Sequence, residues 1–311
     1  MERRALVIVN PQSSGGRTAR RWPAVEARLR EALGALDVEV TRGPRDAERI
    51  AREGARAGVE RIVVAGGDGT LSEVATGLLA NGLGDYVELG VLPLGTGGDF
   101  ARGLSIPSDV DAAIACIARG PSRKIDVGRV AYQGEAGPRT SYFLNVASFG
   151  ISGLVNERVR TSSRALGGSV AFALGALRAI FEYESRPVAI RVDGALVHDA
   201  HLVLAACANA PYFGGGMHVA PGASVSDGAF DLVTVGSLSR LRLVALLARS
   251  YRGEHVNHPR VSQYRGRVVE AEAPAGSVPV ELDGEPLGTL PARIDVLPGA
   301  LRFLLPAEGS A

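Results

Sequence analysis

Three glycines and one carboxylate separate an apolar run from the beginning of a helix near residue 68. Residues 63–65, Val-Val-Ala, are typical of the end of a buried strand, and residues 70–74 of a helix start; Gly66-Gly67-Asp68-Gly69 lies between them. Glycine brings backbone N–H groups close to a ligand, and a helix N-terminus favours negative charge. The pattern predicts a phosphate held by backbone, with Asp68 facing a metal ion or a hydroxyl, and therefore phosphoryl transfer.

Two more glycine-rich loops have the same setting. Asn10-Pro11-Gln12-Ser13-Ser14-Gly15-Gly16 follows an apolar run at 5–9, and Pro93-Leu94-Gly95-Thr96-Gly97-Gly98-Asp99 follows another at 89–92. The first loop alone is compatible with an ordinary turn as well as with a phosphate or ribose contact. All three loops together would converge on one crevice, because ligands of parallel sheets bind beyond the carboxyl ends of the strands. Asp126 could add a third carboxylate, and oxygen ligands with several waters suit magnesium.

Strand and helix signals alternate over the first 128 residues. Apolar runs at 5–9, 38–40, 61–65 and 89–92 predict strands, and helical spacing occurs at 17–33, 46–57, 70–80 and 110–119. This alternation predicts a parallel sheet with right-handed crossovers.

After residue 128 the pattern becomes rich in short strands. Predicted strands lie at 129–132, 142–146, 188–192, 200–206, 230–235, 267–272, 278–282 and 292–297, with helical stretches at 153–184 and 241–252. A chain of 311 residues exceeds one usual core. We predict an α/β nucleotide-binding domain at 1–128 and a β-sandwich domain at 129–311, whose tail could pack back on the first.

Two acidic turns of the second domain have alternative interpretations. Asp227-Gly228 between extended segments is an ordinary hairpin signal, and Glu281-Leu282-Asp283-Gly284-Glu285 also has the form of a hairpin turn. The two carboxylates that flank Gly284 could instead provide a general base in a domain cleft.

Composition and missing motifs exclude several function classes. A net charge of +1 gives no bias toward nucleic acid, and the sole lysine, Lys124, is not part of a P-loop. The five histidines have no zinc-site spacing. Cys116 and Cys207 are expected as core residues in a reducing cytoplasm. The sequence shows neither the pattern of a signal peptide at its start nor an apolar window that could span a membrane.

Taken together, the motifs resemble the diacylglycerol kinase catalytic-domain family, in particular the soluble bacterial lipid kinases related to sphingosine and ceramide kinases. The resemblance covers almost the whole chain. It rests on Asn10-Pro11 with its Ser/Gly loop, Gly66-Gly67-Asp68-Gly69-Thr70, Pro93-Leu94-Gly95-Thr96 with Asp99-Phe100-Ala101, Ile125-Asp126-Val127-Gly128, Asn145 with Phe149-Gly150, Gly214-Gly215-Gly216 before Pro221, Asp227-Gly228 and Asp283-Gly284-Glu285.

The resemblance implies a domain like that of NAD kinase, a C-terminal β-sandwich and ATP in the cleft between them. It implies ATP contacts from Asn10, Pro11, Gln12, Ser13, Ser14, Thr41, Gly66, Gly67, Asp68, Gly69, Thr70, Glu73 and Thr96. Asp68, Asp99 and Asp126 correspond to the carboxylates that organise the catalytic Mg²⁺. A structural Mg²⁺ would use the Asp227 side chain with the carbonyls of Ser224 and Ala229. Asp283 and Glu285 match the family's candidates for the catalytic base.

The implied reaction is in-line attack by the hydroxyl of a lipid such as diacylglycerol on the ATP γ-phosphate, at the membrane surface of the cytoplasm. Residues 158–178, in which Arg160 and Arg164 precede an apolar segment, could touch the membrane or could cover the sandwich. A homodimer is compatible with the resemblance, and nucleic acid is not a partner.

Two positions depart from the family pattern, since Gly98 and Ser72 stand where the family usually has asparagine. A kinase of a soluble substrate, such as NAD kinase, and a non-catalytic lipid- or nucleotide-binding regulator are the two alternative functions. Retention of Asp68, Asp99, Asp283 and Glu285 argues against the regulator.

Overall fold

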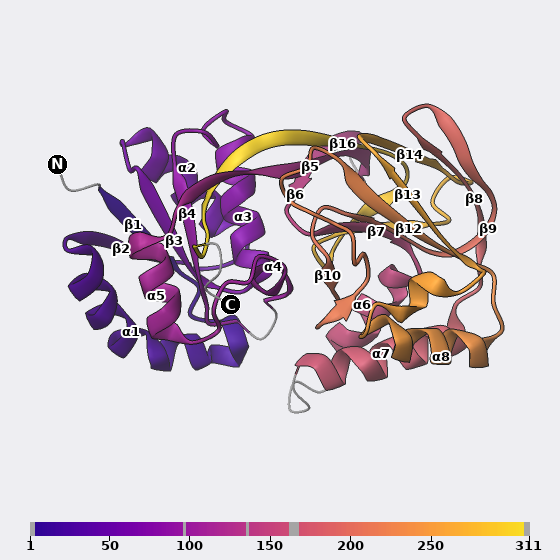
Figure 1. The fold of residues 1–311 in the computed structure, drawn as a ribbon, viewed down its shortest axis with the longest axis horizontal. Helices are drawn as coiled ribbons and strands as arrows, with labels where there is room; N and C mark the ends of the chain where they lie inside the picture. The colour runs from indigo at the N-terminus through magenta and orange to yellow at the C-terminus, as the bar shows by residue number, and fades with distance from the viewer. Residues whose placement is uncertain (1–3, 96–97, 135–136, 162–167, 308–311) are drawn as a thin grey trace. The chain divides into compact units, whose positions relative to one another are not determined.

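The computed structural model describes residues 4–95, 98–134, 137–161 and 168–307, without the side chains of 160, 161 and 168–171 (Figure 1). Its contacts divide the chain into two compact units: unit 1 comprises Met1–Ile125 and Gly299–Ala311, and unit 2 comprises Asp126–Pro298. The sequence-predicted domains, 1–128 and 129–311, have other bounds than these units: unit 2 begins at Asp126, and Gly299–Ala311 belong to unit 1.

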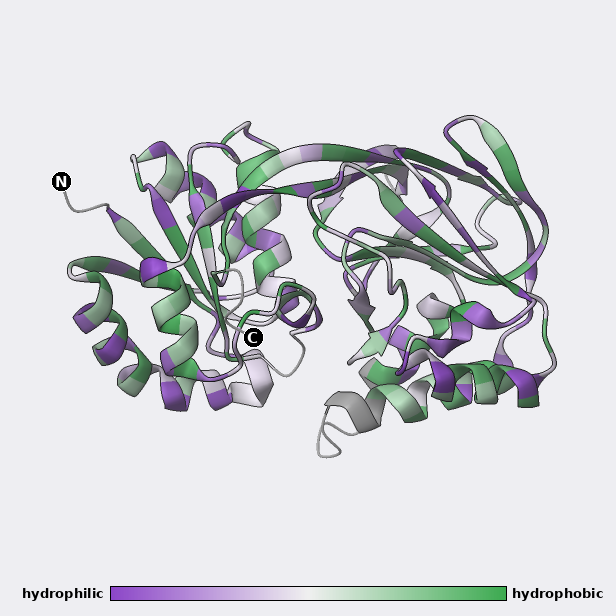
Figure 2. Cartoon of the chain, in the orientation of Figure 1, coloured by the Kyte–Doolittle hydropathy of each residue, from purple (hydrophilic) through white to green (hydrophobic). Residues whose placement is uncertain are grey.

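Unit 1 is built on a parallel sheet in the order β16-β4-β3-β1-β2. Its strands are β1 (Ala5–Val9), β2 (Leu36–Val40), β3 (Arg61–Gly66), β4 (Glu88–Pro93) and the end of β16 (Glu285–Leu304). The central strands are apolar along their length because helices cover both faces (Figure 2).

The helices of unit 1 bury one apolar stripe each against this sheet. On one face α1 contributes Trp22, Val25 and Leu29 to a core shared with α5. On the other face α2 and α3 pack together (Figure 1). The helices are α1 (Arg17–Leu33), α2 (Asp46–Arg56), α3 (Asp68–Leu79), α4 (Asp99–Gly103) and α5 (Val110–Arg119), with a 3-10 helix at Ser13–Gly16.

Unit 2 is a sandwich of antiparallel strands with helices on one outer face. Its strands are β5 (Ser122–Gly134), β6 (Gly137–Phe143), β7 (Val146–Gly150), β8 (Arg186–Val192), β9 (Ala195–Ala208), β10 (Tyr212–Phe213), β11 (Met217–His218), β12 (Phe230–Gly236), β13 (Val261–Gly266), β14 (Val268–Glu272), β15 (Pro279–Leu282) and the start of β16. The helices are α6 (Ile151–Thr161), α7 (Gly168–Glu182) and α8 (Arg240–Ser250), with a 3-10 helix at Glu254–Asn257.

The alternation of side chains along β9 and β12 produces two separate cores. Ala205 and Cys207 of β9 face the sandwich interior with Leu232 of β12. Ala206 and Val233 point to the opposite side and pack under α6, α7 and α8. The second core is the one that matters for the site, because its helices leave a cavity. In the described part of the chain, none of the helices has both the length and the hydropathy needed to cross a bilayer.

Candidate functional site

The structure brings together the three glycine-rich loops predicted from the sequence. The Asn10 amide nitrogen, after β1, donates to the Thr70 hydroxyl on α3 at 2.9 Å. The Ser14 hydroxyl donates to the Leu94 carbonyl after β4 at 2.7 Å, and the N–H of Gly95 donates to the Gly66 carbonyl at 3.0 Å. The carboxyl ends of β1, β3 and β4 therefore share one crevice, as expected for a parallel sheet.

Backbone segments approach so closely in this crevice that a side chain is excluded. A Cβ atom placed on Gly95 would lie 2.5 Å from the Gly67 Cα atom. Non-bonded carbon atoms do not approach this closely, so the loop after β4 needs glycine at position 95 in order to meet the Gly67 backbone.

Asp68 is the first residue of α3 and links the second and third loops. Its Oδ2 atom accepts the N–H groups of Gly98 at 3.1 Å and Asp99 at 3.0 Å. Burial raises the pKa of the Asp68 carboxyl, and these backbone N–H groups counteract that rise. Asp99 is itself buried and forms an ion pair with Arg102 at 3.3 Å. The Asp68 carboxylate thus contacts the backbone of Asp99 in unit 1.

The remaining residues predicted to contact the nucleotide lie in the loops after β1 and β2 and on α3, except Thr96. Thr41 follows β2 and donates its N–H to the Val9 carbonyl at 2.9 Å, so it lies at the same sheet edge. Gln12 donates its N–H to Asn10 Oδ1 at 3.0 Å, which fixes the first loop as a turn. Glu73 accepts the N–H of Ala47 at 3.2 Å and so stabilises the start of α2. Thr96 lies outside the described residues.

Asp126 belongs to unit 2 and is bonded to the Asp227 loop. Its buried carboxylate accepts the N–H of Gly228 at 2.7 Å. Asp227 forms an ion pair with Arg265 at 2.6 Å and also accepts the N–H of Ala229 at 3.2 Å. The predicted carboxylate set is therefore divided between the units, with Asp68 and Asp99 in unit 1 and Asp126 in unit 2.

The donor chemistry around Asp227 suits a hard cation. Asp231, which the sequence analysis missed, has a buried Oδ2 atom without a hydrogen-bond partner among the described residues. Burial raises the pKa of Asp231, Arg265 lowers it and the charge of Asp227 raises it further. The carbonyls of Ser224 and Ala229, predicted as ligands, belong to the same loop. The described side chains do not, however, include any group of three or more His, Cys, Asp or Glu residues arranged for a metal.

The two candidate bases lie in very different environments. Asp283 adopts a left-handed φ of 49°, and its carboxylate accepts three backbone N–H groups, from Leu144 at 3.0 Å, Asn145 at 2.9 Å and Val146 at 3.0 Å. Glu285 is exposed at the start of β16. Asp283 thus anchors the turn to the backbone of residues 144–146, whereas the Glu285 side chain is exposed.

Glu281 is a third acid of this turn, and the sequence analysis did not single it out. It is 1% exposed, and its Oε1 atom accepts a hydrogen bond from the Asn156 amide at 2.7 Å. Burial raises the pKa of Glu281 to about 7. The available sequence signal was a glutamate within a predicted strand. Val280 and Leu282 face the sandwich core, so strand alternation places Glu281 on the opposite face of the sheet.

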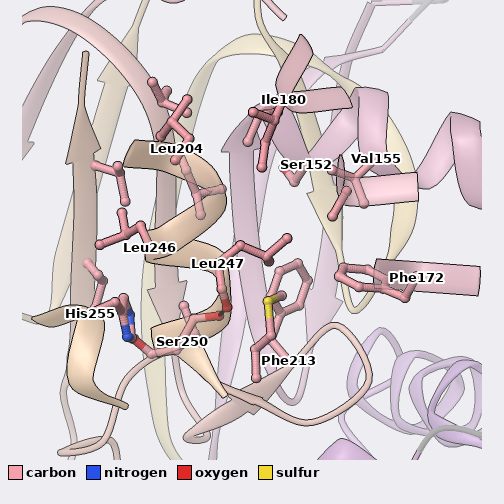
Figure 3. Close-up of a pocket in the computed structure, with 18 of the residues that line it drawn as sticks. Ser152, Val155, Phe172, Ile180, Leu204, Phe213, Leu246, Leu247, Ser250 and His255 are labelled. Carbon is pink, nitrogen blue, oxygen red and sulfur yellow. Dashed lines mark hydrogen bonds between the residues drawn. The ribbon is translucent and has the colours of Figure 1, made fainter. Parts of the chain in front are cut away.

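An apolar pocket lies between the sheet of unit 2 and helices α6, α7 and α8 (Figure 3). Val155, Phe172, Phe213, Leu246 and Leu247 are among its lining residues. Its polar lining is Ser152, Asn156, Ser250 and His255. Ser250 donates to the Leu247 carbonyl and the His255 ring bonds the Val219 carbonyl, so both turn to the backbone and the pocket stays apolar.

Helix α7 also exposes apolar side chains on its outer surface. Leu174, Leu177 and Phe181 are exposed at 40%, 37% and 48%, and Arg178 is exposed beside them. On α8, Leu241 is exposed together with Arg240, Arg242 and Arg249. Of the arginines predicted to precede an apolar segment, Arg164 lies outside the described residues, as does the side chain of Arg160.

Family models match both parts of the chain. The diacylglycerol kinase catalytic domain matches residues 4–130, and the YegS C-terminal NAD kinase beta sandwich-like domain matches residues 145–305. A protein of Chromohalobacter salexigens named "probable lipid kinase YegS-like" is 34% identical over 91% of this chain and 88% of its own. A diacylglycerol kinase of Mycobacterium tuberculosis is 32% identical over 98% of this chain and 96% of its own.

Solved structures show the same fold. A diacylglycerol kinase of Bacillus anthracis superposes with a TM-score of 0.73 at 24% identity, covering 97% of this chain and 96% of that one. Yeast NADH kinase superposes with a TM-score of 0.53 at 14% identity, covering 99% and 85%. The predicted combination of an NAD-kinase-like α/β domain with a β-sandwich is confirmed.

Proposed function

The chain belongs to the diacylglycerol kinase catalytic-domain family, and on that premise we propose that it is an ATP- and Mg²⁺-dependent kinase that phosphorylates the hydroxyl of a lipid. One observation carries the lipid part of this proposal. Asn156 lines the apolar pocket and donates to the Gly284 carbonyl at 2.9 Å, so the pocket adjoins the turn of Asp283 and Glu285. An apolar chain in the pocket would place a polar head group close to candidate bases.

Unit 1 supplies the nucleotide-binding part of the proposal. The backbone of the crevice at Gly66 to Gly69, with Asn10, Ser14 and Thr70 beside it, would hold the phosphates of ATP. The remaining predicted contacts from Pro11 to Ser13 and at Thr41 lie in loops at the same sheet edge. We retain Glu73 as a residue that shapes this crevice through α2.

The acidic residues fit a role in magnesium binding. Asp68 and Asp99 would hold the catalytic ion in unit 1, and Asp126 is the third predicted carboxylate, in unit 2. The Asp227 loop would hold a structural ion. When bound, Mg²⁺ neutralises charge on the phosphates of the nucleotide.

Glu285 is the residue that we assign as the base, because Asp283 is already engaged by three N–H groups. The lipid oxygen forms a bond to the γ-phosphorus of ATP, the bond from that phosphorus to the bridging oxygen breaks, and ADP leaves. The hydroxyl proton passes to the Glu285 carboxylate. Positioning and electrostatics contribute most of the rate in such reactions.

We assign the α7 surface as the part that touches the membrane from the cytoplasm. Leu174, Leu177 and Phe181 are apolar, and Arg178 is available to anionic lipid. The same helix also lines the apolar pocket, through Phe172, Ala176 and Ile180.

A panel of lipid alcohols tests the function. Purified protein is mixed with γ-labelled ATP, Mg²⁺ and vesicles that carry diacylglycerol, phosphatidylglycerol, a sphingoid base or a polyprenol. We expect label in an extractable lipid, and we expect a chelator to abolish the transfer. Label only in NAD would support a soluble-substrate kinase instead, and no transfer to any acceptor would support a non-catalytic regulator.

A further inference from the structure

We propose, resting on the function proposed above, that Glu281 is a positioning residue: it holds Asn156, which in turn fixes the Gly284 carbonyl and so the turn that carries Glu285. Glu281 does not touch a substrate in this role. It acts through one amide group, and its charge sets how firmly that group is held.

Two hydrogen bonds of Asn156 connect Glu281 to the Gly284 carbonyl, and we call this connection the relay. The Nδ2 atom of Asn156 has two hydrogens, and it has two acceptors: Glu281 Oε1 at 2.7 Å and the Gly284 carbonyl at 2.9 Å. One hydrogen therefore serves the buried acid on β15 and the other serves the turn. The side chain of Asn156 is fixed only when both acceptors are in place.

Unpaired polar atoms beside Glu281 favour its ionised form. Glu281 Oε2, Ser148 Oγ and Ser152 Oγ are buried and lack hydrogen-bond partners among the described residues. Both hydroxyls nevertheless lie close enough to the Glu281 carboxylate to lower its pKa. An ionised carboxylate only accepts, so it can satisfy both hydroxyls, whereas a protonated one must donate a hydrogen itself.

Burial opposes ionisation and is the larger influence. It raises the pKa of Glu281 to about 7, against the lowering influence of Asn156, Ser152 and Ser148. The balance between the two forms therefore falls at physiological pH. A charge-assisted hydrogen bond is about twice as strong as a neutral one. The relay should accordingly tighten as pH rises through about 7.

The titratable groups near Glu281 come from β16, α6 and the end of α7. From β16, Glu285 disfavours its ionisation, and β7 contributes no titratable side chain. A surface hollow that Glu281 also lines contains Glu157 of α6 and, after α7, Glu184 and Arg186. The other titratable residues of this neighbourhood are Tyr183, Glu182 and Arg158, the last of which pairs with Glu157 and Glu182.

The decisive experiment is the pH dependence of lipid phosphorylation in Glu281→Gln. Glutamine keeps the size of the side chain and an acceptor for Asn156 but cannot ionise. For the unaltered enzyme we expect kcat to rise through about pH 7. In Glu281→Gln that rise should disappear, kcat at alkaline pH should fall about tenfold, and the KM for ATP should be unchanged. A Glu281→Gln enzyme with the original profile and rate would overturn the inference.

Asn156→Ala tests the path and remains informative if Glu281→Gln does not fold. It should lower kcat to a similar degree and remove the same pH-dependent rise, and Glu281→Gln should add little in the Asn156→Ala background. Full activity of Asn156→Ala, or additive effects in the double variant, would overturn the relay.

A matched control separates this inference from the proposed function. Glu157→Gln removes a neighbouring acid of α6 that lines the same hollow and should keep the original pH profile. If the unaltered protein phosphorylates no lipid, the proposed function fails. If it is active and Glu281→Gln is indistinguishable from it, only the positioning role fails.

Discussion

The two units hold their candidate sites by different means. In unit 1 the crevice is formed by backbone, with the Gly66 and Gly95 loops bonded to each other and closed side by side. In unit 2 the site depends on side chains, because Asn156, Glu281 and Asp283 fix the turn and apolar residues form the pocket. A backbone cradle suits phosphates, which every nucleotide shares. A pocket of side chains suits a ligand whose identity varies, because single substitutions can reshape it.

Asp68→Asn should lower kcat more than any other change considered, and it should do so by altering only the crevice of unit 1. Asparagine can still accept the N–H groups of Gly98 and Asp99, so the fold should persist. It has no charge for a metal ion, and we expect kcat to fall roughly 100-fold or more. Steady-state kinetics, with circular dichroism to confirm folding, would measure this. Asp85→Asn, at an exposed residue paired with Lys124, is the control and should remain active. Near-normal turnover in a folded Asp68→Asn protein would remove Asp68 from the mechanism.

Val155→Phe should change lipid turnover through the pocket of unit 2, and its effect should be smaller than that of Asp68→Asn. Val155 lines the pocket from α6, and a larger ring would shorten the space for an apolar chain. We expect kcat/KM for long-chain lipids to fall about tenfold, with less loss for short chains and no change in the KM for ATP. A series of acyl lengths, compared with the smaller change Val155→Ile, would reveal the gradient. An equal loss for all chain lengths would contradict the pocket's assignment.

Leu177→Glu should have the smallest effect, because it alters neither site. The change removes an exposed apolar side chain from the α7 surface and adds a negative charge. We expect binding to anionic vesicles, measured by co-sedimentation, to weaken about fivefold, while turnover on detergent-dispersed lipid is kept. Leu196→Glu, at another exposed leucine of unit 2, is the matched control. Equal weakening by both variants would mean that α7 is not the docking surface.

The glycine loops of unit 1 could be predicted from sequence alone because each is a local feature of the chain. Each glycine loop directly follows an apolar run, and the topology of a parallel sheet brings the carboxyl ends of such runs to one edge. The predicted strands at 5–9, 61–65 and 89–92 correspond to β1, β3 and β4 within one residue at either end. The crevice with Asn10, Asp68 and Asp99 could therefore be inferred before any coordinates.

Unit 2 resisted the same reasoning because its contacts join distant segments. Asp283 bonds the N–H groups of residues 144–146, and Glu281 bonds Asn156, across more than a hundred residues of chain. The sequence could show neither that Asp283 serves the backbone while Glu285 stays exposed, nor that Glu281 is buried. The sequence predicts one helical stretch at 153–184, and the structure has two helices there, α6 and α7. These two helices and α8 line the pocket.

The sequence by itself determined the family, the fold class and the glycine loops with Asp68, because periodicity and local motifs specify strands, helices and the turns between them. Only the tertiary structure decided the environment of each acid. Burial and hydrogen-bond partners distinguish Asp283, Glu281 and Glu285 from one another, and these depend on which strands pair and which helices cover them.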